Sequence, residues 1–143
     1  MYPSYHLEDI VVSLALARKL KENNVVHPTL FYWRVWDDGS IDCAMVDEDD
    51  FDYRDTGNKI IEKISAYTAT ELMERLPHLI RVSEGQYFTL CIYKSDGDNK
   101  YVVEYESWDY YGEIKILREF ESIKLADALA RMRLWLSETG IVK

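Results

Sequence analysis

The stretch of sequence that decides the fold is QYFTLCIYKSDGDNKYVVEYESW, residues 86–108. Its first part alternates, so that two sets of side chains would point to opposite sides of a strand: Tyr87, Thr89, Cys91 and Tyr93 against Phe88, Leu90 and Ile92. Its last part alternates in the same way: Tyr101, Val103 and Tyr105 against Val102, Glu104 and Glu106. Residues 95–99 lie between the two parts and supply polar turn residues around a glycine. Because alternation with period two is typical of a half-buried strand, this stretch predicts an antiparallel hairpin.

Further strands are predicted on both sides of this hairpin. Residues 30–36 are rich in aromatic and branched side chains, the turn at 37–40 contains a glycine, and residues 41–46 return as the partner strand. Residues 59–64 predict a short strand. Residues 114–120 predict a third strand beside the 86–108 hairpin, which makes it a meander.

Three helices are predicted between these strands. The first follows Ser13 as its N-cap, with a start near Ser4 as the alternative. The second opens with a capping box at Thr68 and stays short because Pro77 cannot continue a helix. The third covers about residues 123–138. Their buried faces are predicted to be formed by Leu14, Leu16, Ala17 and Leu20, by Leu72, Met73 and Leu76, and by Leu125, Leu129, Met132 and Leu136.

The order of these elements predicts an α+β fold, in which antiparallel hairpins and a meander are interleaved with three helices packed on the sheet. A chain of 143 residues with 48% hydrophobic residues fits one domain, residues 1–143. A chain of this size buries about 70% of the surface that it exposes when unfolded. A stable core is therefore expected without disulfides or metals.

The negative charge is concentrated in one stretch. The net charge is −9, and residues 37–55 hold nine acidic residues against Arg54 alone. Such a surface repels phosphate, and the rest of the chain supplies no basic footprint for nucleic acid. We therefore expect no direct binding to nucleic acid.

Motifs for metal binding and catalysis are not convincing in this sequence. Residues 47–58 begin like a calcium loop, but Asp52 stands where the sharp turn needs glycine and Asn58 replaces the bidentate glutamate. The histidines lack zinc-ligand spacing, and there is neither a nucleophile elbow nor a glycine-rich phosphate loop. A dyad assembled in space, such as Cys91 with His78, stays open as an alternative. We predict no catalytic residues, no cofactor and no metal.

The compartment is predicted from the cysteines and the apolar runs. Cys43 and Cys91 lie in apolar, strand-like runs and are interpreted as free thiols. Residues 1–9 have no pattern of a signal peptide, and no apolar run reaches the ~18 residues that cross a bilayer. We expect a cytoplasmic protein without membrane contact.

The aromatic residues make up 13% of the chain and occur in clusters. Neighbours such as Tyr32 and Trp33 point to opposite faces of a strand, so that one core cannot bury both. For the second set of rings three roles are open: cross-strand pairs that stabilise the sheet, a sugar-stacking site, or an exposed recognition face. Tyrosine and tryptophan are enriched in binding hot spots, which fits the recognition face. The candidate partner-binding residues are Trp33, Trp36, Trp108 and Tyr110 in an aromatic sheet face, and Asp47, Asp49, Asp50 and Asp52 in the acidic loop.

Three phrases of the sequence are similar to a known group of proteins. They are SLALARKLK at 13–21 followed by FYW at 31–33, ISAYTATEL at 64–72 running on to Leu76-Pro77, and LADALARM at 125–132 followed by Trp135-Leu136. In this order they resemble small uncharacterised proteins of gut Bacteroides-type bacteria and their prophages and mobile elements. That group has no established activity, so the resemblance brings no catalytic residues with it. It implies a bacterial or phage cytoplasm and an accessory role.

These observations together favour a non-enzymatic interaction module of bacterial or phage origin. We expect it to bind a protein partner through the aromatic sheet face, the acidic loop or both. In one form of this hypothesis the partner has a basic surface, which the acidic loop complements in charge. The domain itself is expected to be a monomer or a weak homodimer. Two alternatives remain: a small enzyme whose site is assembled across the fold, which a deep polar pocket would favour, and a self-associating structural protein.

Overall fold

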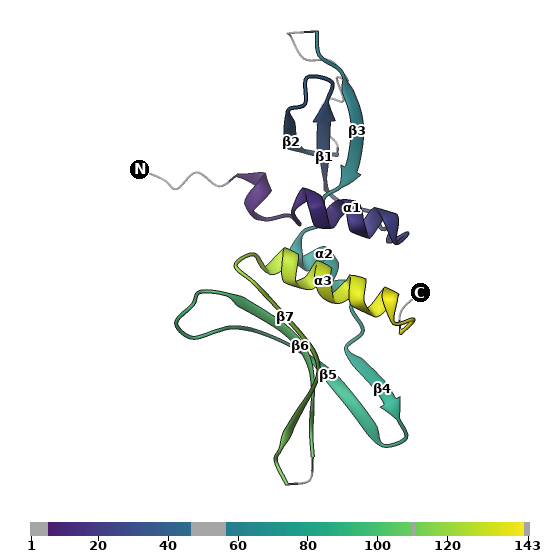
Figure 1. Ribbon diagram of the computed structural model, residues 1–143, viewed down its shortest axis with the longest axis vertical. Helices are drawn as coiled ribbons and strands as arrows, with labels where there is room; N and C mark the ends of the chain where they lie inside the picture. The colour runs from purple at the N-terminus through teal and green to yellow at the C-terminus, as the bar shows by residue number, and fades with distance from the viewer. Residues whose placement is uncertain (1–5, 47–56, 110, 142–143) are drawn as a thin grey trace.

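The structure is a computed structural model that describes residues 6–46, 57–109 and 111–141. It contains two antiparallel sheets, and the α-helices lie in the layer between them (Figure 1). The predicted α+β class is thus confirmed, and the structure adds that the strands divide into two sheets.

The described elements follow one another in the order η1 (Leu7–Asp9, a 3-10 turn), α1 (Leu14–Glu22), β1 (Phe31–Trp36), β2 (Ile41–Met45), β3 (Ile60–Ser65), α2 (Ala69–Glu74), β4 (Leu79–Ser83), β5 (Gln86–Lys94), β6 (Tyr101–Trp108), β7 (Ile114–Ser122) and α3 (Leu125–Glu138). The strand order is β2-β1-β3 in the three-stranded sheet and β4-β5-β6-β7 in the four-stranded sheet. Successive strands of the four-stranded sheet are therefore neighbours, as in a meander.

The three-stranded sheet is built around β1. Trp33 of β1 lies opposite Cys43 on β2 and Ile64 on β3, so these three side chains share one face of the sheet. Trp33 and Ile64 belong to the core cluster, and Cys43 packs against it. This face contacts the helix layer through α1, which packs on β3 (Figure 1).

Helix α3 occupies the centre of the described fold, between α1 and the four-stranded sheet (Figure 1). Its buried side chains go most of the way round the helix: Ala126, Ala128, Leu129, Ala130, Met132, Arg133, Leu134 and Leu136. A helix that is apolar on nearly all sides is typical of a buried position. The core cluster consequently joins residues of both sheets through this helix.

The four-stranded sheet confirms the alternation read from residues 86–108. Leu90 lies opposite Tyr105 and Ile92 opposite Val103, and all four side chains belong to the core or pack against it. The Tyr105 hydroxyl donates to the Pro77 carbonyl at 2.7 Å, which satisfies the polar end of a buried ring.

The helix ends follow the sequence in part. Thr68 forms the predicted capping box, in which its hydroxyl accepts from the Glu71 amide at 3.2 Å and the Glu71 carboxylate accepts from the Thr68 amide at 2.9 Å. Ser13 precedes α1 as predicted, but its side chain makes no capping bond. Its backbone amide instead donates to Asp127 Oδ1 at 2.7 Å, so the first turn of α3 holds the start of α1.

Two details of the sequence prediction are wrong or incomplete. Met73, predicted on the buried face of α2, is exposed, because α2 turns only one narrow side, with Leu72, towards the core. Strand β4 was not predicted, since Ile80 is its one buried side chain. The alternative of a continuous first helix is not seen in residues 6–13, where η1 is followed by a β-bridge between Val11 and Thr68.

Candidate functional site

The face of the four-stranded sheet that points away from α3 is called here the outer face. Strand alternation and the cross-strand register assign fourteen residues to it. They are Leu79 and Arg81 on β4, Tyr87, Thr89, Cys91 and Tyr93 on β5, Val102, Glu104, Glu106 and Trp108 on β6, and Ile114, Ile116, Glu119 and Glu121 on β7. The opposite face carries the core residues that α3 covers.

Large apolar side chains on the outer face are exposed to solvent. About half of the surface of each of six side chains is accessible: Leu79 53%, Tyr87 49%, Tyr93 47%, Trp108 62%, Ile114 49% and Ile116 50%. Single exposed apolar residues are ordinary on protein surfaces, but a group of them on one sheet face is typical of an interaction surface.

A group of glutamates lies in the middle of the outer face. Glu104 on the central strand β6 stands opposite Glu119 on β7 and opposite Cys91 on β5, and Glu106 follows two residues later on the same face. Glu104 is only 3% exposed, and its Oε2 is buried without a hydrogen-bond partner. Glu104, Glu106 and Glu119 are called here the glutamate group.

The environment of the glutamate group changes its protonation. Burial, followed by contacts with Glu106 and Glu119, raises the pKa of Glu104 to about 7. The pKa of Glu106 is lowered, because its carboxylate accepts hydrogen bonds from the Cys91 thiol and from Trp108 Nε1, the latter at 3.1 Å. One member of the group therefore retains a proton near neutral pH, while its neighbour is ionised.

The Cys91 thiol is not prepared for nucleophilic chemistry. Burial and the carboxylates of Glu106 and Glu104 raise its pKa to about 11, so the reactive thiolate is scarce at neutral pH. The backbone of His78 pairs with Leu90, whose side chain faces the core, whereas Cys91 lies on the outer face. Cys91 and His78, the candidate catalytic dyad of the sequence, thus belong to different sides of the sheet. Cys43 and Cys91 are both free, as predicted.

Two of the predicted aromatic contact residues are buried. Trp33 is 7% exposed and donates from Nε1 to the Val12 carbonyl at 2.9 Å. Trp36 is 2% exposed and donates from Nε1 to Asp42 Oδ1 at 3.2 Å. The prediction that these two rings belong to an exposed recognition face is wrong, because one packs in the core and the other is held against its own sheet.

The remaining predicted residues divide into one that is described and five that are not. Trp108 is exposed on the outer face. Tyr110 and the four loop aspartates, Asp47, Asp49, Asp50 and Asp52, lie outside the described residues. The glutamate group was not predicted from the sequence. Alternation places Glu104 and Glu106 on one face of their strand, but it does not show that Glu119 of the next strand lies opposite Glu104.

Two described residues of the acidic stretch have structural partners. Asp42 binds the Arg34 guanidinium with both carboxylate oxygens, each at 2.7 Å, across the β1–β2 pair. Asp38 accepts from the Ser40 amide at 2.9 Å and from Asn58 Nδ2 at 2.9 Å. Part of the charge in this stretch therefore stabilises a hairpin.

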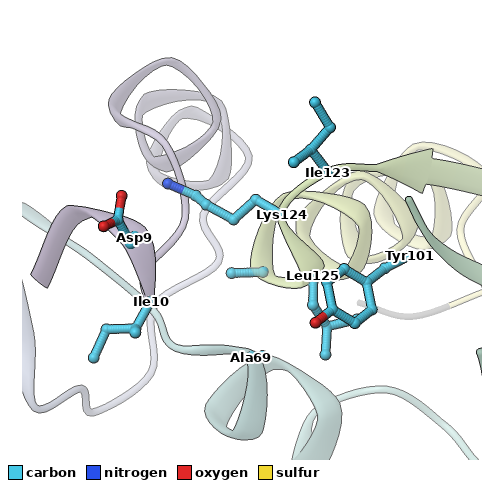
Figure 2. A pocket seen from close by; sticks show the side chains of 8 residues that line it. Asp9, Ile10, Ala69, Tyr101, Ile123, Lys124 and Leu125 are labelled. Atoms are coloured by element: carbon cyan, nitrogen blue, oxygen red, sulfur yellow. The ribbon is translucent and has the colours of Figure 1, made fainter. Parts of the chain in front are cut away.

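A cavity of about 480 Å³ lies between η1, α2 and the start of α3 (Figure 2). The described residues that line it are Asp9, Ile10, Ala69, Tyr101, Ile123, Lys124, Leu125 and Ala126. Its wall is mainly apolar, and the Lys124 ammonium extends towards η1, where it donates to the Glu8 carbonyl at 2.7 Å. The cavity differs from the deep polar pocket that would favour an enzyme.

The described residues contain no group of three or more His, Cys, Asp or Glu side chains placed to hold a metal ion. No helix among them is long and apolar enough to span a membrane. Comparison with models of known protein families, with curated proteins and with solved structures gave no match.

Proposed function

We propose that this protein is an interaction module that binds a protein partner through the outer face of its four-stranded sheet. The observation that carries the proposal is the group of half-exposed aromatic and branched side chains on that face, among them Tyr87, Tyr93 and Trp108. Tyrosine and tryptophan supply large contact areas with few rotatable bonds and are enriched in binding hot spots. The buried Trp33 and Trp36 support the fold rather than the contact.

The charge on the outer face favours a partner with a basic surface. The face carries four glutamates, with Arg81 as its one basic residue, and the whole chain has a net charge of −9. A second copy of the chain, docked face to face by twofold symmetry, would bring the glutamate group against its own copy. Like charges placed against each other across an interface weaken binding by several kcal/mol, whereas opposite charges accelerate the association of two proteins. The proposed occupant is therefore a different protein.

The proposal includes a bacterial or phage origin and a cytoplasmic location. The resemblance of the phrases at 13–21, 64–72 and 125–132 supports the origin. The two free thiols support the compartment, because reducing compartments keep cysteines unpaired.

The proposed surface can be tested by site-directed photo-crosslinking in lysate of the source organism. A benzoyl-phenylalanine is placed at Tyr87 on the outer face or at Ile61, an exposed strand residue of the other sheet (65% accessible), as the matched control. We expect one protein to crosslink from position 87 and not from position 61. That protein is then identified by mass spectrometry and purified.

Direct binding to the purified partner completes the test. We expect Tyr93→Ser and Trp108→Ser to weaken binding at least tenfold, since hot-spot truncations commonly cost about 2 kcal/mol or more. Ile61→Ser should bind as the wild type does. Equal crosslinking from both positions, or unchanged affinity of both outer-face variants, would rule out this surface.

A further inference from the structure

The glutamate group has no compensating cation among the residues of the outer face that surround it. Glu104 and Glu119 stand directly opposite each other on neighbouring strands, where Cβ atoms are about 4.5–5.5 Å apart and like charges destabilise a sheet. Glu106 adds a third carboxylate on the same face. Acidic residues on a surface are ordinary, but this arrangement has a second feature: the Glu104 side chain is almost fully buried, and its Oε2 lacks a hydrogen-bond partner.

The groups around Glu104 offer it no cation. Its neighbours on the outer face are Cys91 and Tyr93 on β5, Glu106 on β6 and Glu119 on β7. The two glutamates raise the pKa of Glu104, and Cys91 and Tyr93 are neutral groups. Glu121, the next acidic residue along β7, is by contrast paired with Lys100 at 3.7 Å. Buried carboxylates in proteins are normally paired with a cation, whereas this group is held by the Glu104 proton and by the donors Cys91 and Trp108. What the group lacks is a positive charge.

We propose that the partner inserts one arginine side chain into the outer face, with its guanidinium between Glu104, Glu106 and Glu119. This inference rests on the proposed function and names the chemistry of the partner's central contact. The guanidinium has five N–H donors in a fixed plane, which suits several carboxylates at once better than the point charge of a lysine. Its faces can stack on aromatic rings, and Tyr93 and Trp108 lie on the same face, Trp108 being hydrogen-bonded to Glu106.

Binding of the arginine is coupled to release of a proton. The pKa of Glu104 is raised to about 7, so at pH 6 most molecules carry a proton in the glutamate group and at pH 8 few do. The guanidinium stays charged throughout this range. One proton leaves Glu104 for solvent as one guanidinium arrives, and competition between them makes binding about tenfold tighter at pH 8 than at pH 6.

The experiment uses the full chain and a defined probe. The probe is an acetylated and amidated peptide TVRVT, with a matched peptide in which neutral citrulline replaces the arginine, and a third in which lysine does. Affinities are measured from the amide chemical shifts of β5, β6 and β7 at constant ionic strength, at pH 6 and pH 8. The variants are Glu104→Gln, Glu119→Gln and, as the control on the same strand and face, Glu121→Gln.

We expect the arginine peptide to shift amides around Glu104 and to bind about tenfold more tightly at pH 8 than at pH 6. Glu104→Gln should lose this pH dependence, Glu119→Gln should weaken binding, and Glu121→Gln should behave as the wild type does. Equal binding of the lysine peptide would overturn the choice of a guanidinium. Equal binding of the citrulline peptide would overturn the arginine site but leave the outer face as a peptide-binding surface. Absence of any shift at millimolar peptide would also overturn the arginine site, and the crosslinking experiment would still test the proposed function.

Discussion

The two sheets of this protein treat similar aromatic strands in opposite ways. In the three-stranded sheet, β1 buries both sets of its side chains: Trp33 faces the core, and Tyr32 and Trp36 on the other side are 8% and 2% exposed. Cationic groups lie over these two rings, with Lys63 above Tyr32 and Arg34 above Trp36, both 5.2 Å from the ring centre. In the four-stranded sheet, β5 and β6 bury one set and leave Tyr87, Tyr93 and Trp108 about half exposed.

This difference shows that aromatic content alone does not mark an interaction surface. An aromatic ring on the second face of a strand is buried where basic side chains can stack over it, as on β1. On the outer face, Trp108 is hydrogen-bonded to Glu106 and stays exposed, and Tyr87 stays exposed although it lies opposite Arg81. A structural aromatic on the second face of a strand is therefore one that a side chain of its own sheet covers, as Lys63 and Arg34 cover Tyr32 and Trp36.

The largest expected effect is the loss of a buried ring of β1. Trp33→Ala should lower the free energy of unfolding by about 3–5 kcal/mol, because it leaves a cavity in the core and removes the bond from Nε1 to the Val12 carbonyl. Urea denaturation at pH 7 measures this change. A loss below about 1 kcal/mol would mean that the ring is not part of the core.

A smaller effect is expected from the glutamate group. The pKa of Glu104 is about 7 in the folded protein against an ordinary value of 4.5, so the folded state binds the proton more tightly than the unfolded state. This contribution to stability is complete below pH 4.5 and disappears as the pH rises through 7. Between pH 5 and pH 8 the wild type should lose about 1–3 kcal/mol of stability relative to Glu104→Gln. Denaturation curves at both pH values measure the difference, and parallel pH profiles of the two proteins would contradict it; Glu121→Gln is the control.

The smallest effect is expected for the exposed ring. Trp108→Ala should change the free energy of unfolding by no more than about 0.5 kcal/mol, since the side chain is 62% accessible and loses only a surface hydrogen bond to Glu106. The same urea titration that reports Trp33→Ala gives the value. If Trp108→Ala proved as costly as Trp33→Ala, the contrast between the two sheets would fail.

Much of the local structure could be predicted from the sequence. The 86–108 hairpin was correct in both its strands and in the direction of their side chains, because strict alternation leaves one choice of face. The capping box at Thr68 and the apolar stripe of α3 were correct for the same reason: each is a pattern within one element. Strand β4 escaped prediction because a strand with one core-facing residue, Ile80, has almost no pattern.

The candidate site could not be predicted in the same way. The glutamate group needs the pairing of Glu104 with Glu119, which lie on different strands and whose register depends on an irregularity after Tyr105. The position of Trp36 depends on Asp42 of the neighbouring strand, which accepts from Trp36 Nε1 and also binds Arg34, the residue that lies over the Trp36 ring. Both are relations between elements, and periodicity within one element carries no information about them.

The central position of α3 also has a consequence for synthesis of the chain on the ribosome. Both sheets and α1 leave the ribosome before α3, the helix against which they pack in the core. Helix α3 also supplies the Asp127 carboxylate that accepts a hydrogen bond from the first residue before α1, Ser13. At ~5–20 residues per second, the nascent chain therefore exposes unpaired apolar sheet faces for several seconds. During that interval each nascent chain already carries the acidic residues of its strands and turns. Like charge of this kind counteracts the association of exposed apolar strands.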